Sequence, residues 1–383
     1  PIINHNASVT NVSQGSSYTI GLSYFSQEGI VGGDKSRFDR YTARINLNQK
    51  VNEKLRVGGN FSYALIDRNS VASNLEFGGL ISNSINLDPI TPVYMDDETV
   101  LNDTLSEYYL NPAVTNADGR YYAISDIIAQ EIVNPLARIE VTHGGLRKAK
   151  FVGNGFAEYE LIDGLKFKTV IGLELDNVTA DGYSPSYYLN SAQSNVVPVV
   201  TKYFGRASIF SNINTLNYKK DLGKHGLDVL LGTSMRDWRF EYMNGSRTGL
   251  ITDDPEKVNL ALATDDLSAQ VYGGVIENAL VSSFGRIIYD YDDKYILTAV
   301  VRRDGSTKFG PDNRFGVFPS FSGGWIISKE RFFPQGGVIS FLKLRASWGQ
   351  NGNDQISDYA WVAAITSGRN YTMRDSSGAE TLV

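Results

Sequence analysis

Cysteine is absent from this chain of 383 residues, and histidine is scarce. Without cysteine there can be no disulfide, no thiolate metal site and no cysteine nucleophile, although many exported bacterial proteins also lack cysteine, so the compartment stays open. The three histidines, His5, His143 and His225, are far apart in the sequence and leave little material for a histidine-based metal site. We therefore expect neither a metal nor a cofactor.

Charged residues and long apolar runs are also limited. Charged side chains make up 20% of the chain and the net charge is −6, so neither a long charged tail nor nucleic acid as a partner is expected. No run of about 18 apolar residues occurs, which excludes a transmembrane helix but not a membrane β-barrel. The sequence has no Gly-x-Ser-x-Gly elbow, no phosphate-binding loop and no His-Glu-x-x-His motif, so we predict that it is not an enzyme.

Aromatic residues and glycine are abundant instead, with 22 Tyr, 18 Phe, 4 Trp and 37 Gly. Glycine exceeds its usual share of about 7%, which points to many turns. Apolar and polar residues alternate along much of the chain, as in YTIGLSY at 18–24, and this period of two indicates strands with one apolar face. The pattern predicts an all-β protein with about 13 strands. They lie near residues 5–13, 17–27, 37–48, 54–67, 147–162, 165–177, 204–219, 226–240, 279–291, 294–304, 315–327, 341–350 and 359–367.

The lengths of the strands and of their connections favour a membrane barrel over a soluble sandwich. Several predicted strands have ten residues or more, and a tilted strand needs roughly 9–11 residues to cross a bilayer. Short links alternate with long loops near 68–146, 178–203 and 241–278, and this asymmetry between the two rims is typical of outer-membrane barrels. The link near 328–340 falls on the short side, where we expect an elaborated periplasmic turn.

Tyrosines in the long loops are candidates for binding a cargo molecule. Aromatic faces stack on sugar rings, and loops carry function disproportionately often. The candidate residues are Tyr94, Tyr121, Tyr122, Tyr187, Tyr188 and Trp238. Loop tyrosines also pack against neighbouring loops or a partner protein, and the sequence gives this alternative equal weight.

Two arginines end the strand predicted at 294–304. Arg302 lies on the face opposite Leu297 and Val301 and should face the lumen. There its charge could be hydrated or paired, or it could contact a plug or a substrate; the hydrated or paired alternative is favoured. Arg303 shares the outward parity but lies at the end of the strand, where it can reach the lipid headgroups or leave the regular strand.

Several motifs, in order along the chain, resemble one family. The longest is SFGRIIYDYDDKYILTAVVRRDGSTKFGPDNRFGVFPSFSGGWIISKERFF at 283–333, which is followed by LKLRASWGQNGN at 342–353. Shorter segments that agree with it lie at 24–30, 38–46, 134–137 and 164–167. Together they closely resemble the barrel of the SusC/RagA-type TonB-dependent transporters, the outer-membrane nutrient importers of Bacteroidetes.

The resemblance implies an antiparallel transmembrane β-barrel of about 22 strands with a plug in its lumen. About 13 strands cannot close such a barrel, and an open sheet would expose unpaired backbone groups to lipid. We therefore expect residues 1–383 to be part of one barrel, a fragment with no separate soluble domain and with the plug outside this chain.

The resemblance also implies a multi-pass location in the bacterial outer membrane and import of oligosaccharides or peptides. The implied partners are a SusD-like surface lipoprotein, outer-membrane lipid and the TonB complex, which would be reached through a part outside this chain. Two other functions stay open: a passive porin or surface adhesion barrel, and a secreted β-sandwich enzyme. A TonB-contacting segment would argue against the porin, and solubility without detergent would argue for the enzyme.

Overall fold

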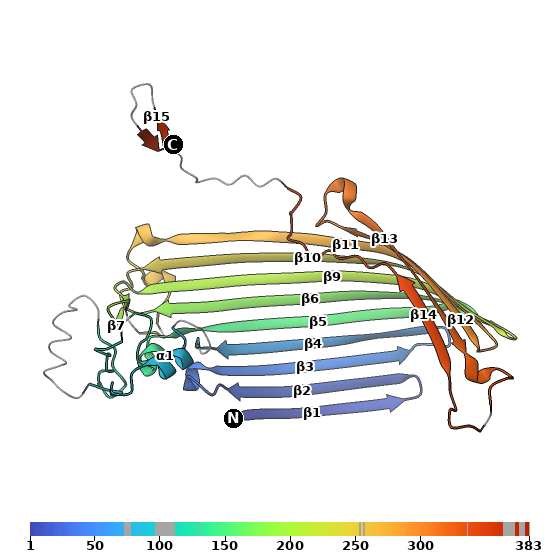
Figure 1. Ribbon diagram of the computed structural model, residues 1–383, viewed down its shortest axis with the longest axis horizontal. Helices are drawn as coiled ribbons and strands as arrows, with labels where there is room; N and C mark the ends of the chain where they lie inside the picture. Colours follow the sequence, from blue (N-terminus) through green and yellow to red (C-terminus); the bar gives the residue numbers. More distant parts are fainter. Residues whose placement is uncertain are drawn as a thin grey trace. The chain divides into compact units, whose positions relative to one another are not determined.

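The computed structural model describes residues 1–72, 78–95, 112–128, 130–252, 254–255, 257–334, 336–362, 372–374 and 380–382. Twelve strands of the described residues form one sheet, in which neighbours along the chain are hydrogen-bonded neighbours in space (Figure 1). The order is β1 (Ile2–Ser13), β2 (Ser16–Glu28), β3 (Arg37–Lys50), β4 (Leu55–Asn69), β5 (His143–Ile162), β6 (Leu165–Ser184), β9 (Val199–Leu222), β10 (His225–Thr248), β11 (Gln270–Tyr291), β12 (Tyr295–Ser306), β13 (Phe315–Ile326) and β14 (Lys343–Gly349). The all-β prediction and its first twelve strands are confirmed.

The thirteenth predicted strand, near 359–367, is a correction. Its described part, residues 359–362, forms turns, and residues 363–367 lie outside the described residues. The turn includes Tyr359, whose φ of 60° is left-handed and incompatible with a strand. Alternation over so few residues did not reveal this backbone conformation.

The central strands are longer than the sequence predicted. β9 and β10 each have 24 residues, which corresponds to about 80 Å of extended chain. As a result the connection after β6 covers residues 185–198 and the connection after β10 covers residues 249–269. The apolar alternation ends earlier than the strands do, and the main-chain hydrogen bonds between neighbouring strands continue beyond it. These strands therefore extend well beyond the thickness of a bilayer.

Smaller elements lie in the connections. The helices are α1 (Leu80–Asn86) and α3 (Pro135–Glu140), and the single 3-10 turns are η1 (Gly33–Lys35), η2 (Leu260–Leu262), η3 (Asp266–Ser268), η4 (Pro311–Asn313) and η5 (Ile327–Lys329). Two short hairpins stand outside the sheet, β7 (Tyr187–Asn190) with β8 (Gln193–Asn195) and β15 (Thr372–Arg374) with β16 (Glu380–Leu382). None of the helices in the described residues has the length and apolar character needed to span a membrane.

The chain divides into two compact units, and the first comprises residues 1–219 and 236–277. Its register places Leu22 opposite Ala43, and Ala43 opposite Tyr63. The face that they share carries exposed large apolar side chains on every strand: Tyr18, Ile20, Ile45, Phe61, Leu65 and Leu173 are examples. The opposite face is polar. There Lys148 bonds Asp176 at 2.6 Å, and Lys150 bonds Glu174 at 2.6 Å.

The second unit comprises residues 220–235 and 278–383, and its strands have the same two faces. On the apolar face Leu297 lies opposite Gly323, and the exposed rings of Phe321 and Trp348 stack with centroids 6.2 Å apart. On the other face, Arg286 pairs with Asp228 at 3.4 Å. In both units the apolar face is the surface for lipid, and the polar face lines the lumen.

Buried apolar side chains are concentrated in the loops between β4 and β5 and between β6 and β9, among them Leu80, Tyr122, Val133 and Leu189. The sheet itself is a single layer, so its apolar face is covered by lipid and not by a second layer of protein. The core of this molecule therefore lies at the end of the sheet that carries the long loops.

Candidate functional site

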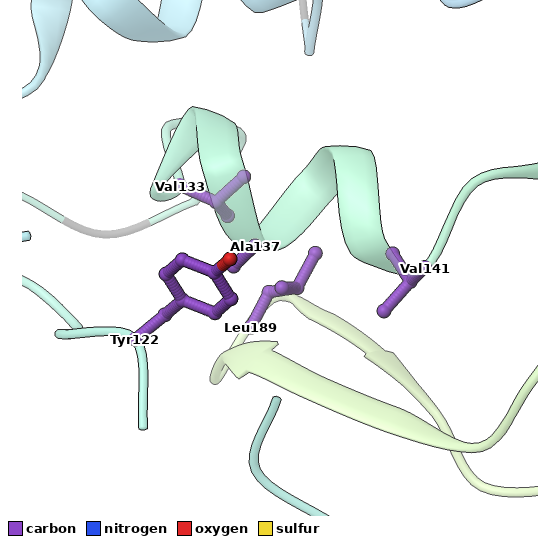
Figure 2. Close-up of a cluster of buried hydrophobic side chains, with 5 residues drawn as sticks. All are labelled: Tyr122, Val133, Ala137, Val141 and Leu189. Atoms are coloured by element: carbon purple, nitrogen blue, oxygen red, sulfur yellow. The ribbon is translucent and has the colours of Figure 1, made fainter. Parts of the chain in front are cut away.

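A cluster of buried side chains, here called the loop core, connects the two loops. It consists of Tyr122, Val133, Ala137, Val141 and Leu189, and the half-buried Tyr94, Val114 and Tyr187 pack against it. Figure 2 shows the Tyr122 ring beside α3, with Leu189 projecting from the β7–β8 hairpin towards the same helix. Apolar side chains of both loops are thus packed in one hydrophobic cluster at the long-loop end of the sheet.

Asn134 organises the helix at the centre of the loop core. Its side-chain oxygen accepts hydrogen bonds from the backbone N–H groups of Leu136, at 3.0 Å, and Ala137, at 3.4 Å, which caps α3. Pro135 follows at the first helical position, where its missing N–H costs nothing. The side-chain nitrogen of Asn134 donates to the carbonyls of Val93, at 3.0 Å, and Ala123, at 3.4 Å. One buried side chain therefore caps a helix and fixes two loop segments.

Tyr122 is the most buried aromatic ring of the loop core. Its hydroxyl donates to Glu140 Oε1 at 3.1 Å, and its ring lies 5.2 Å from that of Tyr94. Arg120 stacks over the outer Tyr94 ring at 4.1 Å. Burial and the neighbouring Glu140 carboxylate both raise the pKa of Tyr122, so this phenol stays protonated and keeps donating its hydrogen bond.

Lys35 joins the loop core from a distant part of the sequence. Its Nζ, in the connection between β2 and β3, donates to the carbonyls of Ile139, at 2.7 Å, and Glu140, at 2.9 Å. These carbonyls end α3, where a cation is favoured by the helix dipole. Burial lowers the pKa of Lys35, and the Glu140 carboxylate partly opposes that change.

His143 lies next to this contact, at the first residue of β5 and beyond the apolar band of the strand. Its ring centroid is 5.5 Å from that of Tyr183 on β6. Burial lowers the pKa of His143, and the charge of Lys35 lowers it further. His143 therefore favours its neutral form in the folded loop core.

The β7–β8 hairpin attaches to the larger loop through hydrogen bonds to main-chain carbonyls of that loop. Tyr188 N donates to Pro112 O at 2.8 Å, and Asn190 Nδ2 donates to the carbonyls of Gln130, at 2.9 Å, and Ile132, at 3.0 Å. A further hydrogen bond links Arg138 Nη2 to Gln193 Oε1 at 2.6 Å. The two loops therefore form one folded unit.

The six predicted cargo residues fall into two groups. Tyr94, Tyr121, Tyr122, Tyr187 and Tyr188 are brought together in and around the loop core, whereas Trp238 lies apart on β10. Tyr122 is 7% exposed and Tyr188 is 5% exposed, which favours the packing alternative for these two rings. A role in cargo binding stays a prediction for all six and is sterically easiest for the half-buried ones.

Trp238 belongs to a row of aromatic rings on one face of β10. Its ring lies 6.1 Å from that of Phe240, which lies 5.6 Å from that of Tyr242. The exposed Leu231 and Met235 lie on the other face of the strand, which carries its apolar, lipid-side residues. The aromatic row therefore faces the lumen, in the part of the wall near the long loops.

The two arginines at the end of β12 have protein partners. Arg302 Nε bonds the Asp304 carboxylate at 2.7 Å, and its Nη2 donates to Ser282 Oγ at 2.8 Å, which favours the pairing alternative. Arg303 lies on the outward face with its guanidinium 4.0 Å from the centre of the Phe315 ring. The aromatic ring shields one side of this cation on the surface that faces lipid.

Sequence reasoning missed Lys35, Asn134 and Asn190 as organising residues of the loops. The Asn134-Pro135 pair is a readable helix start, because Asn caps well and Pro suits the first helical position. No local signal marks Lys35, whose partners are 104 and 105 residues away in the sequence.

The geometry defines the class of protein first. A sheet with one lipid-facing and one lumen-facing surface, short turns at one end and folded loops at the other is part of an antiparallel transmembrane β-barrel.

Comparison with known proteins then identifies the relatives. No family model matches the chain. The chain is 29% identical over 370 residues to TonB-dependent receptor P26 of Formosa agariphila, covering 94% of this chain and 33% of the relative. It is 28% identical over 364 residues to TonB-dependent receptor SusC of Bacteroides thetaiotaomicron, covering 92% of this chain and 34% of that relative. The chain thus spans about a third of the length of these relatives.

A solved structure, titled as that of the RagAB peptide transporter, has the same fold. It superposes with a TM-score of 0.74 at 23% identity and covers 100% of this chain and 40% of its own. The resemblance to the SusC/RagA-type TonB-dependent transporters is therefore confirmed, and the fold is that of part of their barrel. The curated relatives are receptors, which agrees with the prediction that the chain is not an enzyme.

Proposed function

We propose that this chain forms part of the wall and loops of a SusC-like TonB-dependent transporter, which imports oligosaccharides or peptides across the bacterial outer membrane. The observation that carries the proposal is the two-faced sheet, whose strands outreach the bilayer and end in a folded loop core. The sequence similarity to TonB-dependent receptors over more than nine-tenths of the chain supports the same reading.

In this proposal the short turns face the periplasm and the loop core faces the cell exterior. The lumen face is polar, and Lys148, Lys150 and Arg286 on it are each paired with a carboxylate. Such a polar wall can stay hydrated and let polar cargo pass. The half-buried loop tyrosines and the row at Trp238 supply aromatic surface for a sugar ring or a peptide side chain.

The partners follow from the family resemblance. A SusD-like surface lipoprotein would cover the loop core, and the TonB complex would act on a part of the protein outside this chain. The hydrogen bonds between the two loops support a preorganised docking surface, because a partner that binds an ordered surface does not have to order it.

Uptake measured in cells tests the proposal. Labelled oligosaccharides and labelled peptides are offered to cells with and without a functional TonB system, and uptake of one class is expected to depend on both this protein and TonB. Uptake that continues without TonB would support the passive porin, and recovery of the protein in the soluble fraction would support the secreted enzyme.

A co-purification measurement addresses the partner. The protein is extracted from outer membranes in mild detergent, and a lipoprotein is expected to co-elute with it. Replacing exposed residues of the loop core should weaken that association, whereas replacing residues at the short-turn end should leave it intact.

A further inference from the structure

One connection at the short-turn end differs from all the others there. The connections between β1 and β2, β3 and β4, β5 and β6, β9 and β10, and β11 and β12 have two to four residues, and Val51 is the only apolar residue among them. The connection from β13 to β14 instead runs from residue 327 to residue 342. Its described residues include five exposed large apolar side chains: Phe332, Val338, Ile339, Phe341 and Leu342. Here it is called the long turn.

The first half of the long turn is fixed to the lipid-facing side of the sheet. Glu330 Oε1 accepts hydrogen bonds from the Tyr295 hydroxyl, at 2.6 Å, and from Trp325 Nε1, at 3.1 Å. Tyr295 and Trp325 are opposite one another in the register and share the outward face with Leu344. Phe332 then packs edge-on against Trp325, with ring centroids 6.3 Å apart. The turn therefore folds outwards, away from the lumen.

The base of the long turn is also closed. Ser328 N donates to Leu342 O at 3.2 Å, so the segment leaves and rejoins the sheet at one place. Beyond this base, Phe332 is 69% exposed and Val338 is fully exposed. Apolar surface in water costs about 25 cal/mol per Å², so a cluster of this kind on an otherwise polar rim indicates a contact with an apolar medium.

The surroundings of the cluster indicate which medium that is. Tyr295 and Trp325 are aromatic residues at the end of the lipid-facing surface, where such rings lie at the level of the headgroups. The exposed cations Lys329, which pairs with Asp293 at 3.4 Å, and Arg331 flank the apolar side chains, and the long turn carries one carboxylate, Glu330. Apolar side chains next to cations match the boundary between acyl chains and anionic headgroups.

We propose that the long turn inserts its apolar side chains into the headgroup interface of the leaflet at the short-turn end, and so anchors this part of the wall to the bilayer. Lipid is favoured over a protein partner because the turn continues the lipid-facing surface directly through Phe332, Trp325 and Tyr295. The proposal depends on the transmembrane fold and not on the cargo.

Spin labels can measure the depth of the long turn. Because this chain has no cysteine, a single label can be introduced by Val338→Cys or Ile339→Cys in the protein, with any cysteine outside this chain replaced by serine. The labelled protein is placed in phospholipid nanodiscs, and collisions with oxygen and with a water-soluble nickel complex are compared. Glu53→Cys is the control, because the Glu53 side chain is 90% exposed in a short polar turn.

At Val338 and Ile339 the ratio of oxygen to nickel collisions is expected to be several-fold higher than at Glu53. Equal ratios at the three positions would show that the long turn lies in water and would overturn the proposal. Protection of Val338 and Ile339 from both reagents would show that another protein segment covers the turn and would also overturn it. Heat-modifiable mobility on gels confirms that each variant is folded.

Discussion

The wall of the barrel and the loop core are stabilised in different ways. In the wall, neighbouring strands from β2 to β6 are hydrogen-bonded over most of their length, and the apolar side chains remain exposed to lipid. In the loop core, short segments with little regular structure bury their apolar side chains against each other, and single polar residues such as Asn134 connect them. The wall therefore depends on its surroundings, whereas the loop core carries its own hydrophobic interior.

The largest expected effect is a charge on the lipid-facing surface of the wall. Ile171 is 52% exposed on β6, about the right distance from the short turn to lie near the bilayer midplane. We expect Ile171→Arg to lower the free energy of unfolding by about 2–4 kcal/mol, because the guanidinium must leave water. Urea unfolding of the protein in lipid vesicles measures this change.

Asn154→Arg is the matched control, since Asn154 lies on the polar face of β5, opposite the uncharged Asn60 and Gly172. It should change the free energy of unfolding little. Equal losses for the two variants would contradict the assignment of the faces.

Removing the Asn134 side chain should affect the loop core next most strongly. Asn134→Ala deletes the helix cap and leaves the carbonyls of Val93 and Ala123 without their donor, which we expect to cost about 1–3 kcal/mol locally. Hydrogen exchange should become faster in residues 112–142 and stay unchanged in the wall.

Asn116→Ala is the control for that variant, because the Asn116 side chain caps only a local turn, through Asp118 N and Arg120 N. Its effect should be confined to that turn. Faster exchange throughout the wall in Asn134→Ala would show that the two regions are not independent.

Lys35→Met tests the contact between the β2–β3 connection and α3. The variant keeps most of the apolar stem but loses two hydrogen bonds to carbonyls, so we expect a local loss of about 1 kcal/mol. Hydrogen exchange of α3 reports it. Lys50→Met is the control, because it removes only an exposed ion pair with Glu53 and should have no measurable effect. A loss of local stability of the same size in Lys50→Met would argue against a specific role for Lys35.

A dependence on pH through His143 is the smallest expected effect. Its pKa is lower in the folded loop core than the usual value of about 6.5, so protonation favours the opened loop. The stabilisation of the folded loop core by neutral His143 is fully present when the pH is above that usual pKa. It is lost as the pH falls towards the folded-state pKa. Limited proteolysis of residues 112–142 at pH 7.5 and pH 5.5 should show faster cleavage at the lower pH.

His143→Gln should remove most of that difference, and His225→Gln, at the other end of the sheet, should retain it. If His143→Gln left the pH dependence unchanged, another group would have to be responsible.

The wall was predictable from the sequence because its signal is local. Alternation in segments such as 18–24 shows both the strand and its two faces, and the short polar turns show where neighbours meet. The loop core was not predictable, because its contacts join residues far apart that have no common period. Tyr122, for example, was readable as a loop aromatic, but its burial depends on α3 and on Leu189.

The sequence by itself determined twelve strands, their order as neighbours and the side that each strand presents to lipid. The physical reason is that an alternating chain in a single-layer sheet has one arrangement that hides its polar groups from the bilayer. Only the tertiary structure decided how far the strands continue, which loop tyrosines are buried, and that the long turn after β13 folds outwards on Trp325. These features depend on contacts between side chains that are brought together only when the sheet and its loops have formed.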